Sequence, residues 1–246
     1  MIDVFTHKGL VRETNQDDYA IHENGYGLYI VADGMGGHRC GEIASRVAVN
    51  AAQKYLRQYL EHGMTAENMV NTIRAAYTHA NRNILDYVSL EPVCAGMGTT
   101  MTTLICSEEH AVIGHVGDSR AYRFLDGSIV RLTKDHSLVE ELFRRGEITA
   151  EEAENHPQKH VITRALGMSD TLQADVVVHE RCGDDIFLLC TDGLTNHLSD
   201  DELGKWLNKV GKEKNIAQKM VNSANDRGGH DNVTVLIATG SKSTGR

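Results

Sequence analysis

Two long stretches of the chain carry apolar residues at steps of three and four, the spacing that places them on one face of a helix. They are Gly41–Leu60 and Ala66–Tyr87. Near the C-terminus, Asp200–Val210 and Ile216–Asp226 are also predicted helices. The polar segment Ser137–Asn155 is predicted to be helical and to end just before the second of the two prolines. Helices therefore occur in pairs early and late in the chain.

Short apolar runs between these helices predict β-strands. The predicted strands are Ile2–Phe5, Tyr19–His22, Gly27–Ala32, Thr99–Cys106, Ala111–Val116, Ala121–Leu125, Ser128–Leu132, Ala174–Val178, Asp185–Cys190 and Val233–Ala238. Because consecutive strands are joined by short turns, such as the hairpin signal Asp126-Gly127, we expect antiparallel sheets. Strands in meanders and helices in pairs indicate an α+β fold in which helices lie outside two sheets.

The length of 246 residues and the lack of a Ser/Gly-rich linker before the last six residues predict one domain. We expect this domain to span 1–240 and a flexible tail to span 241–246. The first nine residues lack the basic start and apolar core of a signal peptide, and no apolar run approaches the roughly 20 residues of a membrane helix. We therefore expect a cytoplasmic protein without a membrane partner.

Net charge and cysteine spacing exclude several classes of function. The formal charge of −9 argues against nucleic acid as the main partner. The five cysteines are odd in number, and no two are spaced as C-x-x-C. Cys94, Cys106 and Cys190 lie beside or within apolar segments, as buried reduced thiols do. A disulfide framework or a zinc ribbon is therefore not expected.

Aspartates recur at the ends of the predicted strands. Asp33 and Asp192 each follow an apolar run and precede a glycine. The other strand-end aspartates are Asp17, Asp18, Asp118 and Asp231. Taken alone, an Asp-Gly pair is more often a turn than a functional site. If these strand ends meet, however, so many carboxylates cannot all stay ionised without a cation. Oxygen ligands select Mg²⁺ or Mn²⁺ over zinc.

Arg12 is the one basic residue near the first aspartates, five positions before Asp17. A guanidinium group placed there could bind a phosphate through two hydrogen bonds. Spacing alone favours a surface arginine beside a turn over a phosphate-binding residue. Gly34, directly after Asp33, would let a metal approach the backbone carbonyl.

Eight motifs in order resemble those of the bacterial type-2C, metal-dependent Ser/Thr protein phosphatases. They are RETNQD (Arg12–Asp17), DGMGGHRCGEIAS (Asp33–Ser45), GMGTT (Gly96–Thr100), GDSRAY (Gly117–Tyr122), DHS (Asp135–Ser137), HPQKHVITRALG (His156–Gly167), TDGL (Thr191–Leu194) and GGHDNVT (Gly228–Thr234). Any one of them is weak evidence, but eight in sequence over nearly the whole chain are specific. The resemblance implies a four-layer α-β-β-α sandwich with a binuclear metal centre between the two sheets.

The resemblance also implies a role for each matching residue. Asp33 would bridge two ions of Mn²⁺ or Mg²⁺, and the Gly34 carbonyl would bind one of them. Asp192 and Asp231 would complete the other ion's ligands, and Asp17 would hold a water bound to metal. The remaining roles are Arg12 as the phosphate-binding residue, Asp118 as ligand of a third and weaker metal, and 137–167 as a flap beside the active site. A water activated by the two ions would attack phosphorus directly, so no nucleophilic side chain is needed.

Two positions depart from this family pattern. Many eukaryotic members have histidine, a proposed general acid, where this chain has Met35, and methionine cannot donate a proton. Protonation of the leaving group would then fall to His38, to a water on the metals, or to neither. Gln16 stands where many members have glutamate, so we do not include it among the metal ligands.

Other readings of the same residues remain open at this point. Cys40 and Arg46 fit the C-x₅-R spacing of cysteine-dependent tyrosine phosphatases, although Cys40 does not directly follow a strand and its loop lacks the expected glycine. His156 and His160 have a spacing that zinc ligands use, but Pro157 lies between them. A non-catalytic regulator with the same fold would be expected to lack metal-binding aspartates, and this chain has all of them.

The expected function is hydrolysis of phosphoserine and phosphothreonine in proteins, dependent on Mn²⁺ or Mg²⁺. The expected partners are phosphorylated proteins, among them the substrates of a bacterial Ser/Thr kinase and the kinase itself. We expect the protein to act as a monomer.

Overall fold

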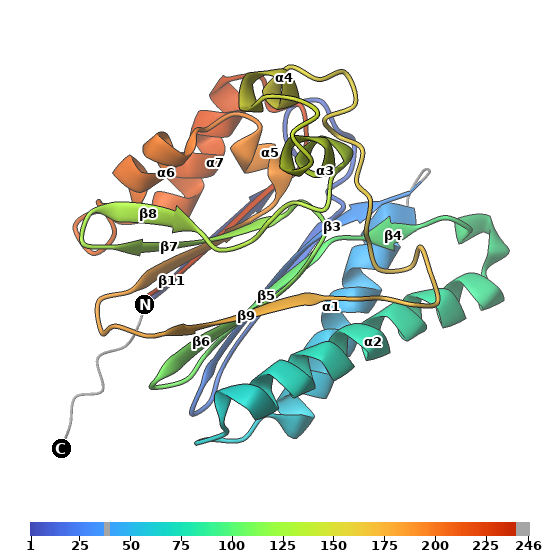
Figure 1. Cartoon of the computed structure of the whole chain (residues 1–246), viewed down its shortest axis with the longest axis horizontal. Helices are drawn as coiled ribbons and strands as arrows, with labels where there is room; N and C mark the ends of the chain where they lie inside the picture. Colours follow the sequence, from blue (N-terminus) through green and yellow to red (C-terminus); the bar gives the residue numbers. More distant parts are fainter. Residues whose placement is uncertain (37–39, 240–246) are drawn as a thin grey trace.

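Two antiparallel β-sheets lie face to face at the centre of the molecule, and helices cover their outer faces (Figure 1). The structure is a computed structural model and describes residues 1–36 and 40–239. The first sheet has the order β1 (Ile2–His7), β11 (Val233–Thr239), β10 (Ile186–Cys190), β7 (Arg120–Leu125) and β8 (Ser128–Arg131). The second has the order β2 (Asp17–Glu23), β3 (Gly27–Met35), β5 (Met101–Cys106), β6 (His110–Val116) and β9 (Asp175–Glu180), with the short strand β4 (Gly98–Thr99) also paired to β3.

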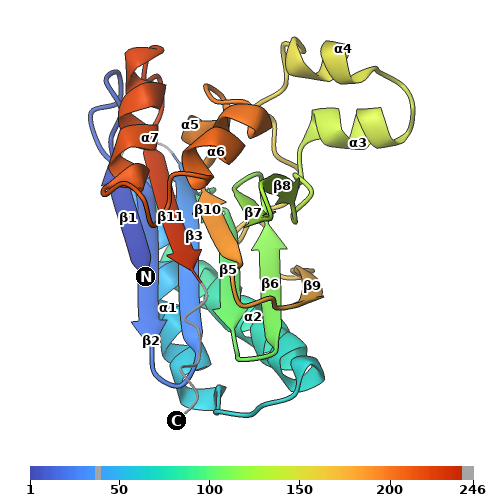
Figure 2. The same ribbon diagram turned by 90° about the vertical axis from the view of Figure 1, so that its left-hand side faces the viewer.

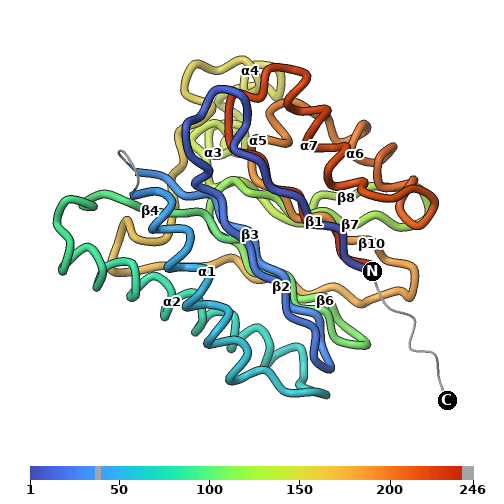
Figure 3. Tube along the Cα trace, turned by 180° about the vertical axis from the view of Figure 1, so that it is seen from behind, coloured from blue at the N-terminus to red at the C-terminus, as the bar shows by residue number. Residues whose placement is uncertain are grey.

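The helices form the two outer layers. The long helices α1 (Cys40–Tyr59) and α2 (Ala66–Leu90) run side by side on the second sheet, as Figures 1 and 3 show. On the first sheet lie α6 (Asp200–Leu207) and α7 (Ile216–Asp226). The α+β class and the four-layer order predicted from the sequence are confirmed. No described helix is both long and apolar enough to span a bilayer.

Alternation along β3 explains how one strand serves two apolar layers. Leu28 and Ile30 point toward α1 and α2, whereas Tyr29 and Val31 point toward the other sheet. All four side chains are buried. Because successive strand residues face opposite sides, a continuous apolar run is needed wherever both faces of a sheet are covered.

The predicted helix Ser137–Asn155 is wrong as a single element. The structure has two short helices there, α3 (Leu138–Arg144) and α4 (Ala150–Glu154), which project beyond the sheets (Figure 2). Gly146 between them has a positive φ of 72°, which ends the first helix. Thr149 then begins the second helix with a capping box, in which its side chain and that of Glu152 bind each other's backbone N–H groups.

Two further local differences concern short elements. Thr100 interrupts the predicted strand Thr99–Cys106 and separates β4 from β5. Two short helices were not predicted: η1 (Pro92–Cys94), a single 3₁₀ turn, and α5 (Asp192–Thr195). Elements this short carry too few residues to show a periodic pattern.

The expectation of a reduced thiol is wrong for Cys94. Cys40, the first residue of α1, forms a disulfide with Cys94 in η1 across a sequence separation of 54 residues. Cys106 and Cys190 are free and buried, as predicted, and Cys182 is free and exposed. Sequence spacing could not reveal the pair because the two cysteines meet only when α1 and the end of α2 pack together.

Candidate active site

The strand-end aspartates converge at one edge of the sandwich. Asp17 begins β2 and lies directly opposite Asp33 of β3 in the sheet register. From the other sheet, Asp192 follows β10 and Asp231 precedes β11. Asp118 lies in the turn between β6 and β7. Four of these residues line one cavity of about 720 Å³, and Asp17 is not among the lining residues.

Burial and mutual repulsion raise the pKa values of these carboxyl groups. Burial, followed by repulsion from Asp17 and Asp192, raises the pKa of Asp33 well above its ordinary value. Burial raises the pKa of Asp17 to about 7 and that of Asp118 to about 8. Burial and the charge of Asp231 raise the pKa of Asp192 as well. Such a cluster binds protons or cations readily, because either relieves the repulsion.

Hydrogen bonds hold two of the aspartates in fixed orientations. The hydroxyl groups of Thr191 and Thr234 donate to Oδ2 of Asp17 at 2.9 and 2.6 Å. The side-chain amide of Asn196 donates to Oδ2 of Asp192 at 3.0 Å. In the described part of the chain, Oδ1 of Asp17 and Oδ1 of Asp192 are buried and accept no hydrogen bond. One oxygen of each carboxylate is therefore fixed by a neighbour and the other is available to a ligand.

These features fit divalent cations with oxygen ligands. Buried carboxylate oxygens without a donor are costly unless a cation binds them. Within 1–36 and 40–239, no three acidic, histidine or cysteine side chains are close enough together to hold one ion. A cation here would accordingly need other oxygen ligands as well, such as backbone carbonyls and water, as Mg²⁺ commonly does.

Gly34 brings the backbone to the cavity between β3 and the start of α1. A Cβ atom at this position would lie 2.0 Å from the carbonyl oxygen of Gly41, so no other residue fits without a shift of the helix. The backbone N–H of Gly34 donates to the carbonyl of Gln16 at 3.0 Å. Gly34 itself lines the cavity, as the sequence predicts for a residue whose carbonyl would meet a metal.

Arg12 lies at the rim of the same cavity. Its Nη2 is 2.7 Å from Oδ2 of Asp231, and about half of its side chain is exposed. Asn232 fastens the loop that carries Arg12, because its side-chain amide donates to the carbonyls of Lys8 and Thr14. An exposed guanidinium group next to the acidic cluster can exchange this carboxylate for a phosphate group.

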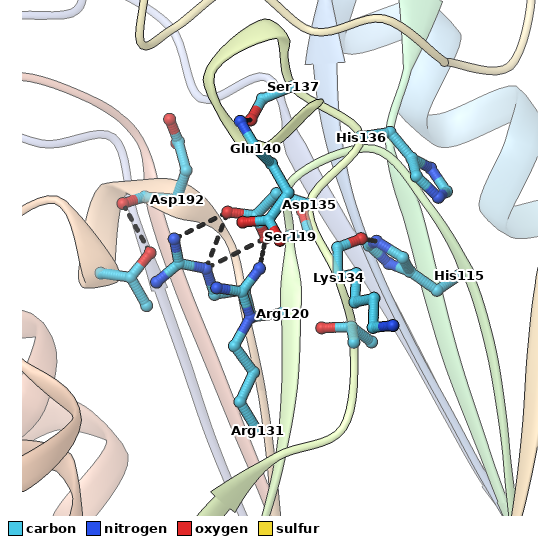
Figure 4. Close-up of polar contacts among 12 residues, drawn as sticks. His115, Ser119, Arg120, Arg131, Lys134, Asp135, His136, Ser137, Glu140 and Asp192 are labelled. Carbon is cyan, nitrogen blue, oxygen red and sulfur yellow. Dashed lines mark hydrogen bonds and ion pairs between the residues drawn. The ribbon is translucent and has the colours of Figure 1, made fainter. Parts of the chain in front are cut away.

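Two other arginines near the site are already paired. Figure 4 shows the guanidinium groups of Arg120 and Arg131 converging on Asp135. Nη2 of Arg120 lies 2.7 Å from Oδ2 of Asp135. Because Asp135 takes up these positive charges, they do little to neutralise Asp118, whose pKa stays raised.

Several residues that line the cavity were not among the predicted residues of a phosphatase site, although His160 was considered as a zinc ligand. Lys159, His160 and Ile162 line the cavity from the base of the segment that carries α3 and α4. The rings of His197 and His230 stack at its rim, with centroids 5.6 Å apart. They come from loops distant in sequence. Lys159, His160, Ile162 and His230 lie within the motifs HPQKHVITRALG and GGHDNVT, whereas His197 lies in none of the eight motifs.

Met35 also lines the cavity and offers no proton. His38, the predicted alternative donor, lies outside the described residues.

The rival sites predicted from the sequence are not supported. The sulfur of Cys40 is bonded to Cys94, so it is not a free nucleophile as a cysteine-dependent phosphatase requires. His156 is not among the residues that line the cavity, whereas His160 is.

Comparison with known proteins gives one consistent result. A family profile described as protein phosphatase 2C matches residues 8–234. The serine/threonine phosphatase stp of Listeria welshimeri is 38% identical over 234 residues, which cover 94% of this chain and 92% of that protein. The crystal structure of the Mycobacterium tuberculosis serine/threonine phosphatase PstP/Ppp has a TM-score of 0.88 and 33% identity, with coverage of 98% of this chain and 99% of the other.

A second solved structure bears on the metal. The catalytic domain of the phosphatase PstP in complex with two manganese ions has a TM-score of 0.85 and 33% identity, and covers 98% of both chains. The match therefore includes a relative whose structure contains one of the two metals expected for the acidic cluster. Together with the profile match and the layered fold, these relatives show that the chain belongs to the protein phosphatase 2C family of metal-dependent serine/threonine phosphatases.

Proposed function

We propose that this protein hydrolyses phosphoserine and phosphothreonine in proteins and depends on Mn²⁺ or Mg²⁺. The observation that carries the proposal is the group of four aspartates from both sheets that line one cavity, one of which, Asp192, has a buried oxygen that accepts no hydrogen bond among the described residues. The relatives named above bear the same activity in their names.

Asp33, Gly34, Asp192 and Asp231 are the proposed ligands of two core ions. Asp33, which lies opposite Asp17 in the sheet register and lines the cavity, would bridge both ions, and the neighbouring Gly34 carbonyl would bind one of them. Asp192 and Asp231 would complete one ion's ligands, which requires their carboxylates and that of Asp33 to lie closer together than they do in this structure. Asp17 is the proposed partner of a water on the metals, since Thr191 and Thr234 fix one of its oxygens. Asp118 is the proposed ligand of a third, weaker ion.

The chemistry divides between the cations and this chain's own residues. When bound, the cations supply a water of lowered pKa as the nucleophile. Arg12 binds the substrate phosphate through two hydrogen bonds of its guanidinium group, and its ion pair with Asp231 breaks when it does so. The threonine hydroxyls and Asn196 keep the carboxylates oriented throughout. No residue of the chain needs to form a phosphoenzyme, so the disulfide-bonded Cys40 has no part in the reaction.

The domain limits and the partners belong to the same proposal. Residues 1–240 would form a single catalytic domain, with 137–167 as a flap whose base contributes Lys159 and His160 to the cavity. The substrates would be phosphoproteins produced by a Ser/Thr kinase, and the kinase itself. The protein would act as a monomer in the cytoplasm. The tail 241–246 lies outside the described residues.

Phosphatase assays on phosphoserine, phosphothreonine and phosphotyrosine peptides test this proposal. With Mn²⁺ we expect turnover of the first two peptides, and with EDTA we expect none. The control is Cys40→Ser at saturating Mn²⁺. A cysteine-dependent phosphatase would lose its activity with this substitution, and its wild type would stay active in EDTA. Activity that survives EDTA would contradict the proposal.

A further inference from the structure

The disulfide between Cys40 and Cys94 lies next to the proposed metal site. Cys40 begins α1 and is followed by Gly41, whose carbonyl packs against Gly34. Cys94 ends η1, and its carbonyl accepts the backbone N–H of Met97 at 3.0 Å. The disulfide thus joins two chain segments that are distant in sequence and both reach the end of β3.

Gly36 lies between these two segments. A Cβ atom built on Gly36 would be 3.2 Å from the backbone nitrogen of Gly41 and 3.3 Å from Cα of Met97. The chain just after Asp33 and Gly34 is therefore in contact with the segment that follows each cysteine. If the two segments moved apart, Gly36 would lose its packing against both Gly41 and Met97.

The Cys94 segment also fixes the backbone of Asp33. The N–H of Thr100 donates to the Asp33 carbonyl at 2.9 Å, and the Thr99 hydroxyl donates to the same carbonyl at 2.8 Å. In return, the N–H of Asp33 donates to the Thr100 hydroxyl at 2.9 Å. The disulfide therefore ties α1 to the segment that holds the proposed bridging ligand.

We propose that Cys40 and Cys94 are a site of reversible thiol oxidation, and that the disulfide strengthens Mn²⁺ binding at Asp33 and Gly34. This inference rests on the proposed metal site. With the bond closed, the two segments around 33–36 are already held in the arrangement that binds the ion. Binding then costs less conformational entropy. With the bond open, only non-covalent contacts hold them.

The reaction is thiol–disulfide exchange with a small disulfide such as oxidised glutathione. Cys40 lies at the N-terminus of a 20-residue helix, where the helix dipole stabilises a thiolate, and it attacks the small disulfide and releases one thiol. The thiolate of Cys94 then attacks the mixed disulfide, which forms the Cys40–Cys94 bond and releases the second thiol. Two protons and two electrons pass from the protein to the small disulfide, and a dithiol reverses the reaction.

Both cysteines are buried but lie just beneath the surface. Cys40 is 9% and Cys94 3% exposed, whereas Val93, beside Cys94, is 85% exposed. A small disulfide can reach the pair after a local opening of η1, which has a single turn.

The test compares Mn²⁺ binding in the two redox states of the full chain. Protein is treated with oxidised glutathione or with a dithiol and then desalted. Maleimide labelling and mass spectrometry should count three free thiols in the first sample and five in the second. The dissociation constant, measured from the electron paramagnetic resonance signal of free Mn²⁺, should be about 5-fold or more higher in the reduced sample.

Two variants sharpen the comparison. The double variant Cys40→Ser/Cys94→Ser should bind Mn²⁺ as weakly as the reduced wild type under both treatments. Cys182→Ser, which removes an exposed free thiol, should respond as the wild type does. The reduced wild type carries no substitution, so the conclusion does not depend on how well the double variant folds.

Equal dissociation constants in samples with three and five thiols would overturn the inference, and so would a thiol count that glutathione leaves at five. These results differ from a failure of the proposed function. If Mn²⁺ binds and Asp33→Asn abolishes binding, the metal site holds even where the redox state has no effect. If neither redox state binds Mn²⁺, the metal site itself is wrong.

Discussion

At the scale of single residues, Asp192 lowers the stability of the fold but suits the binding of a cation. Its carboxyl group is buried close to Asp231, which raises its pKa, and its Oδ1 accepts no hydrogen bond from the described residues. Such a group costs stability until a cation neutralises it. Replacing Asp192 with a neutral residue should therefore not lower the stability of the protein without metal.

Asp192→Asn should separate metal binding from folding. Saturating Mn²⁺, at about 100 times the dissociation constant, should raise the melting temperature of the wild type by about 5–10 °C. The variant should lose most of this rise and its phosphatase activity, while its melting temperature in EDTA stays equal or increases. Differential scanning calorimetry with and without Mn²⁺ measures both effects. Asp201→Asn, at an exposed position in α6, is the control, and a full Mn²⁺ response in Asp192→Asn would refute the assignment.

Arg12→Ala tests the proposed phosphate contact. Loss of a charge-assisted pair of hydrogen bonds should raise KM about 10-fold or more for a phosphopeptide and change kcat less. Arg12→Lys should recover part of the loss, because lysine keeps the charge but not the fork. Steady-state kinetics in Mn²⁺ decides the outcome, with Arg57→Ala on the exposed side of α1 as the control. An unchanged KM would remove Arg12 from the site.

At the scale of elements, periodicity predicted the long segments well and the short ones poorly. The helix predicted over Ile216–Asp226 has those bounds in the structure, and α1 and α2 differ from their predictions by at most three residues at either end. The segment around α3 and α4 was mistaken for one helix because its polar residues suit a helix throughout. Gly146 and the capping box at Thr149 were the signals that divide it.

The disulfide between α1 and η1 gives a prediction for stability. Closing a separation of 54 residues restricts the unfolded chain, so reducing the bond should lower the free energy of unfolding by about 2–4 kcal/mol. Urea unfolding in EDTA, followed by the fluorescence of the single tryptophan, Trp206, measures the difference between oxidised and reduced protein. Cys182→Ser should show the same difference as the wild type. Identical unfolding midpoints in the two states would contradict the prediction.

At the scale of the whole molecule, three apolar layers hold the four structural layers together. One lies between the two sheets, and one lies between each sheet and its helices. Tyr29, Leu104, Phe187 and Leu236 are all nearly fully buried between the sheets. The site occupies the edge of this sandwich, where strand ends from both sheets meet, and its geometry therefore depends on how the sheets are stacked.

The buried His115 makes global stability depend on pH. Burial, assisted by the neighbouring His136, lowers the pKa of His115 to about 4, and its ring is bonded to the hydroxyl of Thr102 and the carbonyl of Lys134. The folded state keeps this ring neutral, whereas in the unfolded chain it becomes protonated below about pH 6.5. The contribution of His115 to the free energy of unfolding is therefore full above pH 6.5 and is lost as the pH falls toward 4. The loss amounts to about 2 kcal/mol between pH 7.5 and 5.

Urea unfolding in EDTA at the two pH values checks this contribution. His115→Gln should show a fall in unfolding free energy that is about 2 kcal/mol smaller than that of the wild type. His62→Gln, at an exposed position, should keep the wild-type dependence and serves as the control. Equal pH dependence in His115→Gln and the wild type would show that the ring is protonated without cost.

The sequence by itself determined the elements, the fold class and the candidate ligands. Steps of three and four, alternation, and short turns are properties of neighbouring residues, so they can be read from the chain. The aspartates at strand ends and the order of eight motifs likewise pointed to a metal-dependent phosphatase before any contact was known. Asp33, Gly34, Asp118, Asp192 and Asp231 do line one cavity.

Only the tertiary structure decided which side chains meet. The bond between Cys40 and Cys94 depends on the packing of distant segments, and so do the hydrogen bonds from Thr191 and Thr234 to Asp17. Neither pairing leaves a local pattern, because the partners are separated by 54 residues in one case and by 174 or more in the others. The sequence supplies the charges of the site, and the stacking of two sheets brings them close enough to raise one another's pKa values and so to favour a cation.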